Sequence, residues 1–578
     1  MICMADFKRE LALAVEKAVP ALRLEEIEKL LETPPDKSLG DFALPCFKLS
    51  ALLKKAPQEI ASELQQKLAL PESFEKASAV GNYLNFFLKQ QTLVQEVLGK
   101  VLKEGEKFGA VKAGKGKKVM VEFISPNTNK PLHIGHLRNA FLGDCFARLF
   151  QAQGFKAIRA NLINDRGVHI CKSMLAFEKW GKGLTPKKAG KKPDHFVGDY
   201  YVLFSQKAAQ NPGLEEEALE MINKWEKGNK QVLKVWKIMN DWAVQGMRET
   251  WESVGIGFDK LYFESKIYKQ GREIVLKGLK KGIFEKNDDG AVIVKLEPYN
   301  LPDKVLLRAD GTSIYITQDI YLAKKKFQDF KGLQESLYVV ASEQDLHFKQ
   351  LFKVLEMLNF PFAEKCRHVS YGMVNLPEGK MKSREGKVVD ADDLISELEA
   401  LVQIELVKRH PEISEKELLK RRKAITSAAL RFHLLKIEAQ KDFVFNPAES
   451  LSFEGETGPY LLYTYARAKS ILRKAPKNLL AGKVDFSMLL KESEKEIASM
   501  LSQYPAILQQ SLKNYSPHVL CHYLLKLASA FNTYYHETPV IKAETEGNSK
   551  ARLALVKAVS TVLKNSLQVL GIQVLEQM

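Results

Sequence analysis

Residues 119–139 predict a strand, a sharp turn and a helix in direct succession, and no other stretch restricts the fold as much. The stretch begins with an apolar run that carries one acid, Glu122, which is typical of a buried strand. The segment Ser125–Asn127 is a turn signal. From His136 onward, apolar residues recur at helical spacing. A strand that leads directly into a helix indicates an α/β fold.

The joint between this strand and this helix carries two histidines, His133 and His136, with Gly135 between them. In an α/β fold the first N–H groups of the helix point outward at such a joint, and the helix dipole favours negative charge there. Glycine lets a ligand approach the backbone closely, and imidazoles can donate hydrogen bonds to phosphate oxygens. We therefore expect a nucleotide phosphate to bind at this turn.

A second strand and a second polar turn follow the helix. Residues 155–164 predict the strand, which ends in the polar residues 164–167. Residues 337–342 predict another strand, again followed by polar residues. Open parallel sheets bind ligands at the carboxyl ends of their strands. The spacing predicts a Rossmann-type parallel sheet over residues 113–375, interrupted by an insertion at about 176–300.

The chain on either side of this region has a different pattern. Residues 1–112 combine helical spacing with an alternating strand and predict an α+β domain. Residues 376–445 carry a basic loop with glycine near both ends. Residues 446–578 predict one helix after another without a repeat, which is typical of an all-α bundle. We expect an N-terminal α+β domain, a Rossmann-type catalytic domain and a C-terminal helical bundle.

The composition narrows the function further. Lysine and arginine number 87 against 70 acids, giving a net charge of +17, and this excess favours a polyanion such as nucleic acid as the partner. The six cysteines have no metal-ligand spacing, so we expect reduced core thiols and no zinc site. We find no secretory leader and no apolar run of about 18 residues. We expect a cytoplasmic protein that does not span a membrane.

The motifs together resemble the arginyl-tRNA synthetases, a family of class I aminoacyl-tRNA synthetases. The two class I signatures correspond to His133-Ile134-Gly135-His136 and to the altered loop Lys380-Met381-Lys382-Ser383. The first signature alone is a moderate signal, since nucleotidyltransferases also carry it. The more specific segments, which extend the resemblance to nearly the whole chain, are Glu122–Asn127, Lys130–Arg138, Tyr315-x-x-x-Asp319, Gln344–Phe348, His368–Val374 and Gly458–Arg467.

The resemblance implies a two-step reaction. L-Arginine and ATP would form arginyl-adenylate and diphosphate, and the arginyl group would then pass to the 3′-terminal adenosine of tRNA(Arg), giving arginyl-tRNA and AMP. Such chemistry depends mainly on positioning and charge stabilisation, with Mg²⁺ accompanying ATP. The resemblance also implies a monomer that binds tRNA before it activates arginine. Its bundle would bind the anticodon, residues 376–445 would contact the tRNA stem, and the N-terminal domain would contact the outer corner of the tRNA.

The arginine substrate is a planar cation with five hydrogen-bond donors, which a carboxylate can bind in a fork. Tyr315 and Asp319 lie four residues apart and share one face of a helix, and the resemblance assigns the guanidinium to them. It also implies that Glu122, Asn127 and Gln344 hold the ammonium, carboxylate or polar flank of arginine. The alternative for Asp319 is a helix N-terminal acid with only a capping role. The alternative for Glu122 is a surface acid on an edge strand.

The resemblance places the ATP site around the His-x-Gly-His turn. The expected catalytic residues are His133, His136, Lys130 and Lys382. The expected ATP ligands are Pro126, Lys130, His133, Gly135, His136, His347, Lys380 and Lys382. In the altered loop, Ser383 stands where the family has its second lysine. Because Lys130 lies three residues before His133, we expect Lys130 to supply the main positive charge on the phosphates, with Lys380 or Lys382 assisting.

The tRNA is expected to bind through side chains that stack on its bases or bond to them. In the N-terminal domain the candidates are Tyr83, Asn85 and Phe86. In the helical bundle they are Tyr460, Tyr463 and Tyr534. The three bundle tyrosines could equally be core residues.

Three other functions fit parts of the pattern. The first is a class I synthetase for another amino acid, but the Tyr315–Asp319 pair and the lack of zinc-spaced cysteines argue against the cysteinyl enzyme. The second is a nucleotidyltransferase, which would be much shorter and lack the bundle. The third is an inactive RNA-binding paralogue, which the altered loop favours and the intact His133–His136 motif opposes. tRNA-dependent ATP–pyrophosphate exchange with each amino acid separates all of these functions.

Overall fold

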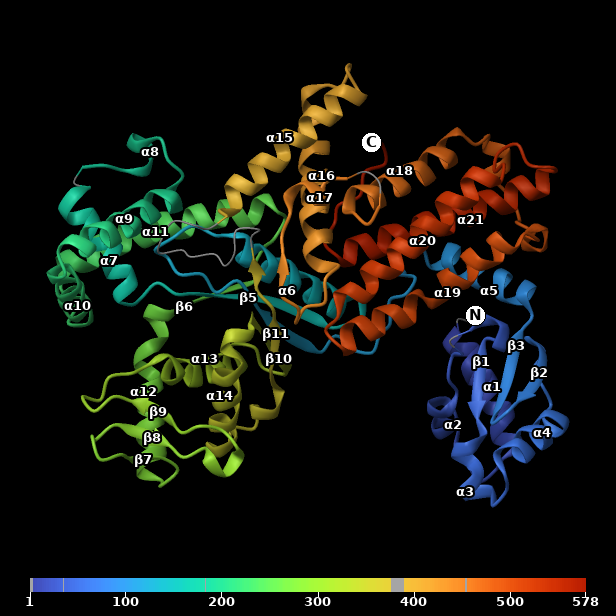
Figure 1. Ribbon diagram of the computed structural model, residues 1–578, viewed down its shortest axis with the longest axis horizontal. Coiled ribbons are helices and arrows are strands. Elements are labelled where there is room, and N and C mark those ends of the chain that lie inside the picture. The colour runs from blue at the N-terminus through green and yellow to red at the C-terminus, as the bar shows by residue number, and fades with distance from the viewer. Residues whose placement is uncertain (1–3, 35, 182, 376–388, 453–454) are drawn as a thin grey trace.

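The computed structural model describes residues 4–34, 36–181, 183–375, 389–452 and 455–578. Within these residues the centre of the molecule is a five-stranded parallel sheet in the order β11-β10-β4-β5-β6 (Figure 1). The strands are β4 (Lys118–Glu122), β5 (Lys156–Ile163), β6 (Lys260–Phe263), β10 (Leu333–Ala341) and β11 (Cys366–Tyr371). The chain leaves β4 toward β5 on one side and returns to β10 on the other. The switch point, where such sheets bind ligands, therefore lies between β4 and β10.

Helix α6 (Ile134–Ala152) follows β4 and is buried along most of its length. It packs against β4, β5 and α16 (Glu415–Leu435). Close packing on the sheet requires Gly143, because a Cβ at this position would lie 2.2 Å from Cγ of Phe123. The helix begins slightly before His136, the predicted start, because the side chain of His133 caps it. The strand–turn–helix prediction and the Rossmann-type fold are confirmed.

The insertion between β5 and β6 is helical and has a core of its own. Its helices are α7 (Val168–Trp180), α8 (Pro186–Ala189), α9 (Pro193–Gln210), α10 (Gly213–Glu226) and α11 (Lys230–Ser253). A second excursion, between β6 and β10, contains α12 (Glu264–Lys280), the antiparallel strands β7 (Glu285–Lys286), β8 (Val292–Val294) and β9 (Lys304–Leu307), and α13 (Tyr315–Asp329). The single insertion predicted at about 176–300 therefore needs correction, because β6 lies inside it and joins the central sheet. β6 has four residues and one buried side chain, Tyr262, which is too short a pattern to detect.

The N-terminal domain is a small α+β unit that stands apart from the sheet domain (Figure 1). Its antiparallel strands, in the order β1-β3-β2, are β1 (Phe42–Pro45), β2 (Phe74–Val80) and β3 (Tyr83–Leu88). Its helices are α1 (Met4–Ala18), α2 (Leu24–Leu30), α3 (Ser50–Leu53) and α4 (Pro57–Lys67). The next helix, α5 (Gln90–Glu104), packs on the C-terminal helices α19 (Glu492–Lys513) and α21 (Glu546–Val569) and so attaches the domain to the bundle.

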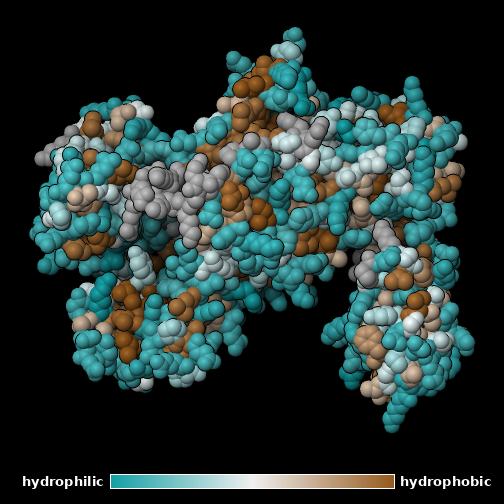
Figure 2. Space-filling model, viewed as in Figure 1, coloured by the Kyte–Doolittle hydropathy of each residue, from teal (hydrophilic) through white to brown (hydrophobic). Residues whose placement is uncertain are grey.

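The C-terminal half is mainly helical. After α14 (Asp345–Met357) and β11, a short strand β12 (Val374–Asn375) pairs with β13 (Phe443–Val444). The remaining helices are α15 (Ala391–Arg409), α17 (Pro447–Ser450), α18 (Gly458–Lys474) and α20 (Pro517–Glu537). α15 and α16 project from the body as a hairpin, on which apolar side chains gather (Figures 1 and 2). None of the described helices is long and apolar enough to cross a membrane.

Candidate active site

The turn between β4 and α6 presents two neutral imidazoles. Nδ1 of His133 accepts the N–H of Gly135 at 3.1 Å, and Nδ1 of His136 accepts the N–H of His133 at 3.1 Å. Each ring therefore has its proton on Nε2, which is left to donate. Burial, reinforced by the charge of Lys130, lowers the pKa of His133 to about 3, and burial moves the pKa of His136 well below its usual value. These rings act as hydrogen-bond donors and not as cations at neutral pH.

The backbone of this turn is held in a rare conformation. Ile124 and Ser125 have φ angles of 73° and 47°, which are costly for residues with a side chain and most of all for a β-branched one. Two buried asparagines hold the strained peptides: Asn139 Oδ1 accepts the N–H of Ile124 at 2.5 Å, and Asn161 Oδ1 accepts the N–H of Ser125 at 3.0 Å. The strain brings Asn127 beside the carboxyl end of β5.

The wall of the turn comes from a distant part of the chain. The N–H of Ile134 donates to the carbonyl of Val389 at 3.2 Å, and the N–H of Ala391 donates to the carbonyl of Leu132 at 3.0 Å. The amino ends of α6 and α15 therefore meet at His133. A helix amino end favours an anion, and two of them lie side by side at this turn.

The structure brings Lys130 and Pro126 close to the same turn. Lys130 is half-buried, and its charge lowers the pKa values of both His133 and His136. Pro126 is buried, and its carbonyl accepts the N–H of Asn164 at 3.0 Å. The predicted ATP ligands Lys380 and Lys382, like Ser383, lie outside the described residues.

An acidic region lies on the other side of the switch point. Asp319, on the second turn of α13, accepts a hydrogen bond from Nε2 of His347 at 2.8 Å. Tyr315, one turn earlier, is 63% exposed, and Gln344 is exposed between β10 and α14. His347 therefore has its hydrogen-bond partner in the acidic region. The contact of His347 with ATP stays a prediction.

Glu122 lies at the carboxyl end of β4 and is buried, with 4% of its surface exposed. Its Oε2 lies 2.8 Å from Nζ of Lys326, which is fully buried and sits 3.6 Å from the ring centroid of Tyr338. Burial raises the pKa of Glu122, and the charge of Lys326 opposes that rise. The interpretation of Glu122 as a surface acid is therefore wrong, because this acid has a dedicated counterion in the core.

Sequence reasoning missed Glu264, the first residue of α12. This carboxyl is 2% exposed, and burial raises its pKa to about 7. Its Oε1 accepts Nε2–H of Gln318 at 2.8 Å, while Oε2 has no hydrogen-bond partner among the described residues. With Tyr315 it lines a cavity of about 790 Å³. The charge of Asp319 raises the pKa of Glu264, so the two acids lie near each other. The sequence signal that could have identified Glu264 is its position directly after a strand, but the sequence analysis did not predict that strand, β6.

Two of the predicted tRNA contacts in the N-terminal domain are wrong. Asn85 is only 3% exposed, and Phe86 is fully buried because its side chain packs in the hydrophobic core. Tyr83 is 37% exposed and makes an edge contact with Phe47, which is 44% exposed, at a ring-centroid distance of 5.7 Å. The exposed aromatic pair is therefore Tyr83 with Phe47.

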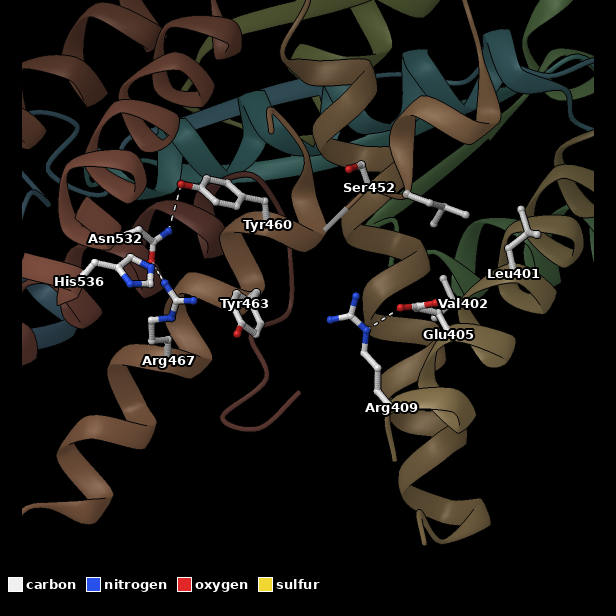
Figure 3. Close-up of a pocket in the computed structure, with 11 residues that line it drawn as sticks. Leu401, Val402, Glu405, Arg409, Ser452, Tyr460, Tyr463, Arg467, Asn532 and His536 are labelled. Carbon is white, nitrogen blue, oxygen red and sulfur yellow. Dashed lines mark hydrogen bonds and ion pairs between the residues drawn. The ribbon is translucent and has the colours of Figure 1, made fainter. Parts of the chain in front are cut away.

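The three tyrosines of the helical bundle also differ in how much of their side chains is exposed. Tyr534 is fully buried near Glu494 and has no face for a base, so that prediction is wrong. Tyr463 is 37% exposed, and the guanidinium of Arg467 lies 4.8 Å from its ring centroid. The hydroxyl of Tyr460 accepts a hydrogen bond from Asn532 at 3.0 Å. Tyr460 and Tyr463 line a cavity of about 760 Å³ between α18 and α15 (Figure 3).

Three family models match the N-terminal, central and C-terminal parts of the chain. Residues 97–447 match the catalytic domain of the class I tRNA synthetases (R), and residues 461–578 match the DALR anticodon binding domain. Residues 5–88 match the arginyl tRNA synthetase N-terminal domain.

Two curated relatives and two solved structures are similar along the whole chain. The arginine–tRNA ligase of Treponema denticola is 44% identical over 593 residues, covering 100% of both chains. That of Borrelia duttonii is 40% identical over 587 residues, covering 99% of both. The arginyl-tRNA synthetase of Thermus thermophilus superposes with a TM-score of 0.80 at 28% identity, covering 100% of both chains. The Plasmodium falciparum structure shares the fold, with a TM-score of 0.78 at 19% identity and 100% coverage of both.

The family models, the full-length relatives and the geometry of the switch point agree. The turn after β4 presents two imidazole donors, α12 and α13 carry the acids Glu264 and Asp319, and residues 461–578 match the DALR anticodon binding domain. The chain belongs to the arginyl-tRNA synthetases, the class I arginine–tRNA ligases.

Proposed function

We propose that this chain activates L-arginine with ATP and transfers it to the 3′-terminal adenosine of tRNA(Arg) in the cytoplasm, acting as a monomer. In the first step an arginine carboxylate oxygen attacks the α-phosphorus, and the bond to diphosphate breaks. In the second step a ribose hydroxyl attacks the arginyl carbonyl, and AMP leaves. The observation that supports the proposal is that one sheet carries both the carboxylates of Glu264 and Asp319 and the two imidazole donors of the turn after β4.

Asp319 and Glu264 bind the guanidinium in this proposal. A cation with five donors needs acceptors on more than one side. Glu264 Oε2 lacks a partner among the described residues, and Asp319 keeps one oxygen beyond its bond to His347. Tyr315 stacks on or bonds to the guanidinium. Gln344 and Asn127 hold the polar end of arginine, and Glu122 acts on the ammonium from its ion pair with Lys326.

His133 and His136 donate from Nε2 to the phosphates, and Lys130 adds a full positive charge. Pro126 and Gly135 contact the nucleotide, His347 reaches it from the acidic side, and Lys380 and Lys382 assist from the altered loop. Mg²⁺ that accompanies ATP would supply further positive charge to the phosphates. It would bind mainly through water and phosphate oxygens, so the proposal assigns it no protein ligand.

In this proposal the tRNA contacts the chain at three places outside the active site. Tyr83 and Phe47 offer exposed rings to unpaired bases at the outer corner, and Tyr460 and Tyr463 offer rings and a hydroxyl to the anticodon loop. Residues 376–445, including the α15–α16 hairpin, contact the stem between them.

ATP–pyrophosphate exchange with each amino acid, with and without tRNA(Arg), tests the proposal. We expect exchange with arginine alone, and only when tRNA is present. Phe47→Ala and Tyr83→Ala should raise the KM for tRNA and leave the KM for arginine unchanged. Exchange with another amino acid, or none with any, would overturn the proposal.

A further inference from the structure

Helix α9 belongs to the insertion, yet its second turn packs against the segment that carries Lys130. A Cβ at Gly198 would lie 2.8 Å from Cδ of Pro131 and 3.6 Å from Cα of Lys130. The backbones of α9 and of this segment therefore approach with no room for a side chain between them. The position of α9 limits where the Lys130 backbone can lie.

The amino end of α9 reaches the opposite wall of the same turn. Nζ of Lys192 donates to Oδ2 of Asp392 at 2.6 Å and to Oγ1 of Thr250, on α11, at 2.5 Å. Nε2 of His195 lies 2.9 Å from the same Asp392 oxygen and 3.5 Å from Oδ1 of Asp390. Lys192 and His195 thus bind the first turn of α15 from the insertion.

Asp390 connects these contacts to the phosphate turn. Its side chain caps α15 by accepting the N–H of Asp392 at 2.8 Å, and its backbone bridges to His133. The neighbours of Asp390 on both sides hydrogen-bond to Leu132 and Ile134, as described above. Side-chain contacts from the amino end of α9 are therefore continuous, through Asp392 and Asp390, with the peptides of the His133–Gly135 turn.

A metal ion is a weaker explanation of this cluster. Ligand atoms of Asp194, His195 and Asp392 lie within 4.8 Å of one another. The ammonium of Lys192 already bonds to Asp392 and lies 3.4 Å from Asp194. The positive charge that these carboxylates require is therefore supplied by the protein.

We propose that Lys192 and His195 are positioning residues that hold the Val389–Asp392 segment against the His133–Gly135 turn and so set its geometry for adenylate formation. The inference rests on the proposed function and extends it to residues that touch neither arginine nor ATP. A misplaced phosphate-facing peptide slows the step in which phosphate charge moves, and leaves the later transfer of arginine to tRNA much less affected.

The ionisation of His195 provides a second test of the positioning role of these two residues. The charged groups near the ring are Asp194 in the first turn of α9 and Asp390 and Asp392 at the start of α15. Lys192, which caps α9, and Thr250 on α11 bond to the same Asp392 oxygen as the ring. The hydrogen bond to Asp392 raises the pKa of His195 above 6.5. The charged pair is therefore complete below pH 6.5 and is lost as the pH rises through the raised value.

The test compares Lys192→Ala with Lys191→Ala in the full chain with tRNA(Arg). Lys191 is the adjacent lysine and pairs with Asp199 on the exposed side of α9. We expect Lys192→Ala to lower the rate of adenylate formation by about 10- to 100-fold, with single-turnover transfer from bound arginyl-adenylate little changed. Lys191→Ala should match the unmodified chain in both steps. Asp392→Asn combined with Lys192→Ala should slow adenylate formation by less than the product of the two separate effects, since both changes weaken the Lys192–Asp392 contact.

His195→Gln is a second variant, and it tests the inference even if Lys192→Ala does not fold. Glutamine can still hydrogen-bond to Asp392 but does not titrate. The unmodified chain should lose kcat/KM for ATP as the pH rises through the pKa of His195, and His195→Gln should show no such loss. Equal exchange rates for Lys192→Ala and Lys191→Ala, or equal slowing of both steps, would overturn the inference. Failure of the unmodified chain to activate arginine would instead overturn the proposed function.

Discussion

At the scale of single residues, the acidic pocket makes arginine binding depend on pH. Burial raises the pKa of Glu264 to about 7, so this carboxyl is only partly ionised near neutrality. Only the ionised form attracts a guanidinium, and the KM for arginine should therefore fall as the pH rises through 7. Steady-state exchange measured across that range checks this, and in Glu264→Gln the dependence should disappear. A KM that is independent of pH in the unmodified chain would remove Glu264 from the site.

Asp319 differs from Glu264 because it has 21% of its side chain exposed and a histidine partner. Asp319→Asn keeps the shape and removes the charge, so a charge-assisted hydrogen bond worth about 2 kcal/mol is lost. We expect the KM for arginine to rise by about 30-fold, with the KM for ATP unchanged. If Asp319 acted only as a helix N-terminal acid, Asp319→Asn would lower the melting temperature and leave the KM for arginine as it was.

For Lys130, the sequence predicts the main phosphate charge, and the structure places this residue beside the histidine turn. Its charge reaches both histidines of the turn, and α9 confines its backbone. Lys130→Ala should slow adenylate formation by about 100-fold, measured by rapid quench, and Lys130→Arg should restore part of the rate. If Lys382→Ala abolished activity while Lys130→Ala did little, the main phosphate charge would belong to the altered loop instead.

At the scale of secondary-structure elements, strong local patterns were predictable and weak ones were not. The run from Val119 to Asn139 combines a full apolar strand with a long helix, so β4 and α6 could be recognised. β6 could not, and Glu264 was lost with it. Exposure also lay beyond sequence reasoning, because Tyr83 and Phe86 alternate along one strand whose two faces are covered unequally. The contact of Val389 with Ile134 depends on residues 255 positions apart, and no local pattern contains it.

The approach of α6 to the sheet gives a prediction at this scale. A Cβ at position 143 would overlap the ring of Phe123, so Gly143→Ala forces the helix away from β4. We expect a loss of about 1–3 kcal/mol in the free energy of unfolding and slower exchange, because α6 carries the histidine turn. Gly99→Ala is the matched control. Gly99 is also helical but has open space around its Cβ position, so this change should be neutral or slightly stabilising. Equal effects of the two changes would contradict the close-packing argument.

At the scale of the whole molecule, one buried ionic cluster joins the catalytic helix to the insertion and the bundle. Arg431 on α16 donates to Oδ2 of Asp144 on α6 at 2.9 Å and to the carbonyl of Val254, after α11, at 2.7 Å. Nη1, the nitrogen that bonds Asp144, also reaches the carbonyl of Leu570 at the end of α21, at 3.5 Å. Segments far apart in the chain therefore meet at a side chain with no exposed surface, and the helix that carries Asp144 has the histidine turn at its amino end.

We expect Arg431→Ala to weaken the contacts between these regions more than it destabilises any single region. The change leaves Asp144 with the guanidinium groups of Arg148 and Arg159 but leaves the carbonyls of Val254 and Leu570 without a donor. Breaking a buried pair of this kind costs about 3–5 kcal/mol. Scanning calorimetry should show a lower melting temperature and a transition that separates into the unfolding of two or more parts. The control is Arg473→Ala, an exposed arginine near the C-terminal end, which should leave the transition single.

The acid response of the same variant gives an independent check. Burial raises the pKa of Asp144, but the charges of Arg431, Arg148 and Arg159 outweigh burial and lower it to about 2. The stabilisation by Asp144 is therefore complete above pH 3.8 and is lost as the pH falls through about 2. Without Arg431 the pKa of Asp144 lies closer to 3.8, and the loss of stability between these two pH values should become smaller. Acid unfolding followed by circular dichroism measures this difference. An Arg431→Ala chain with unchanged acid response and a single thermal transition would show that the three regions are held together elsewhere.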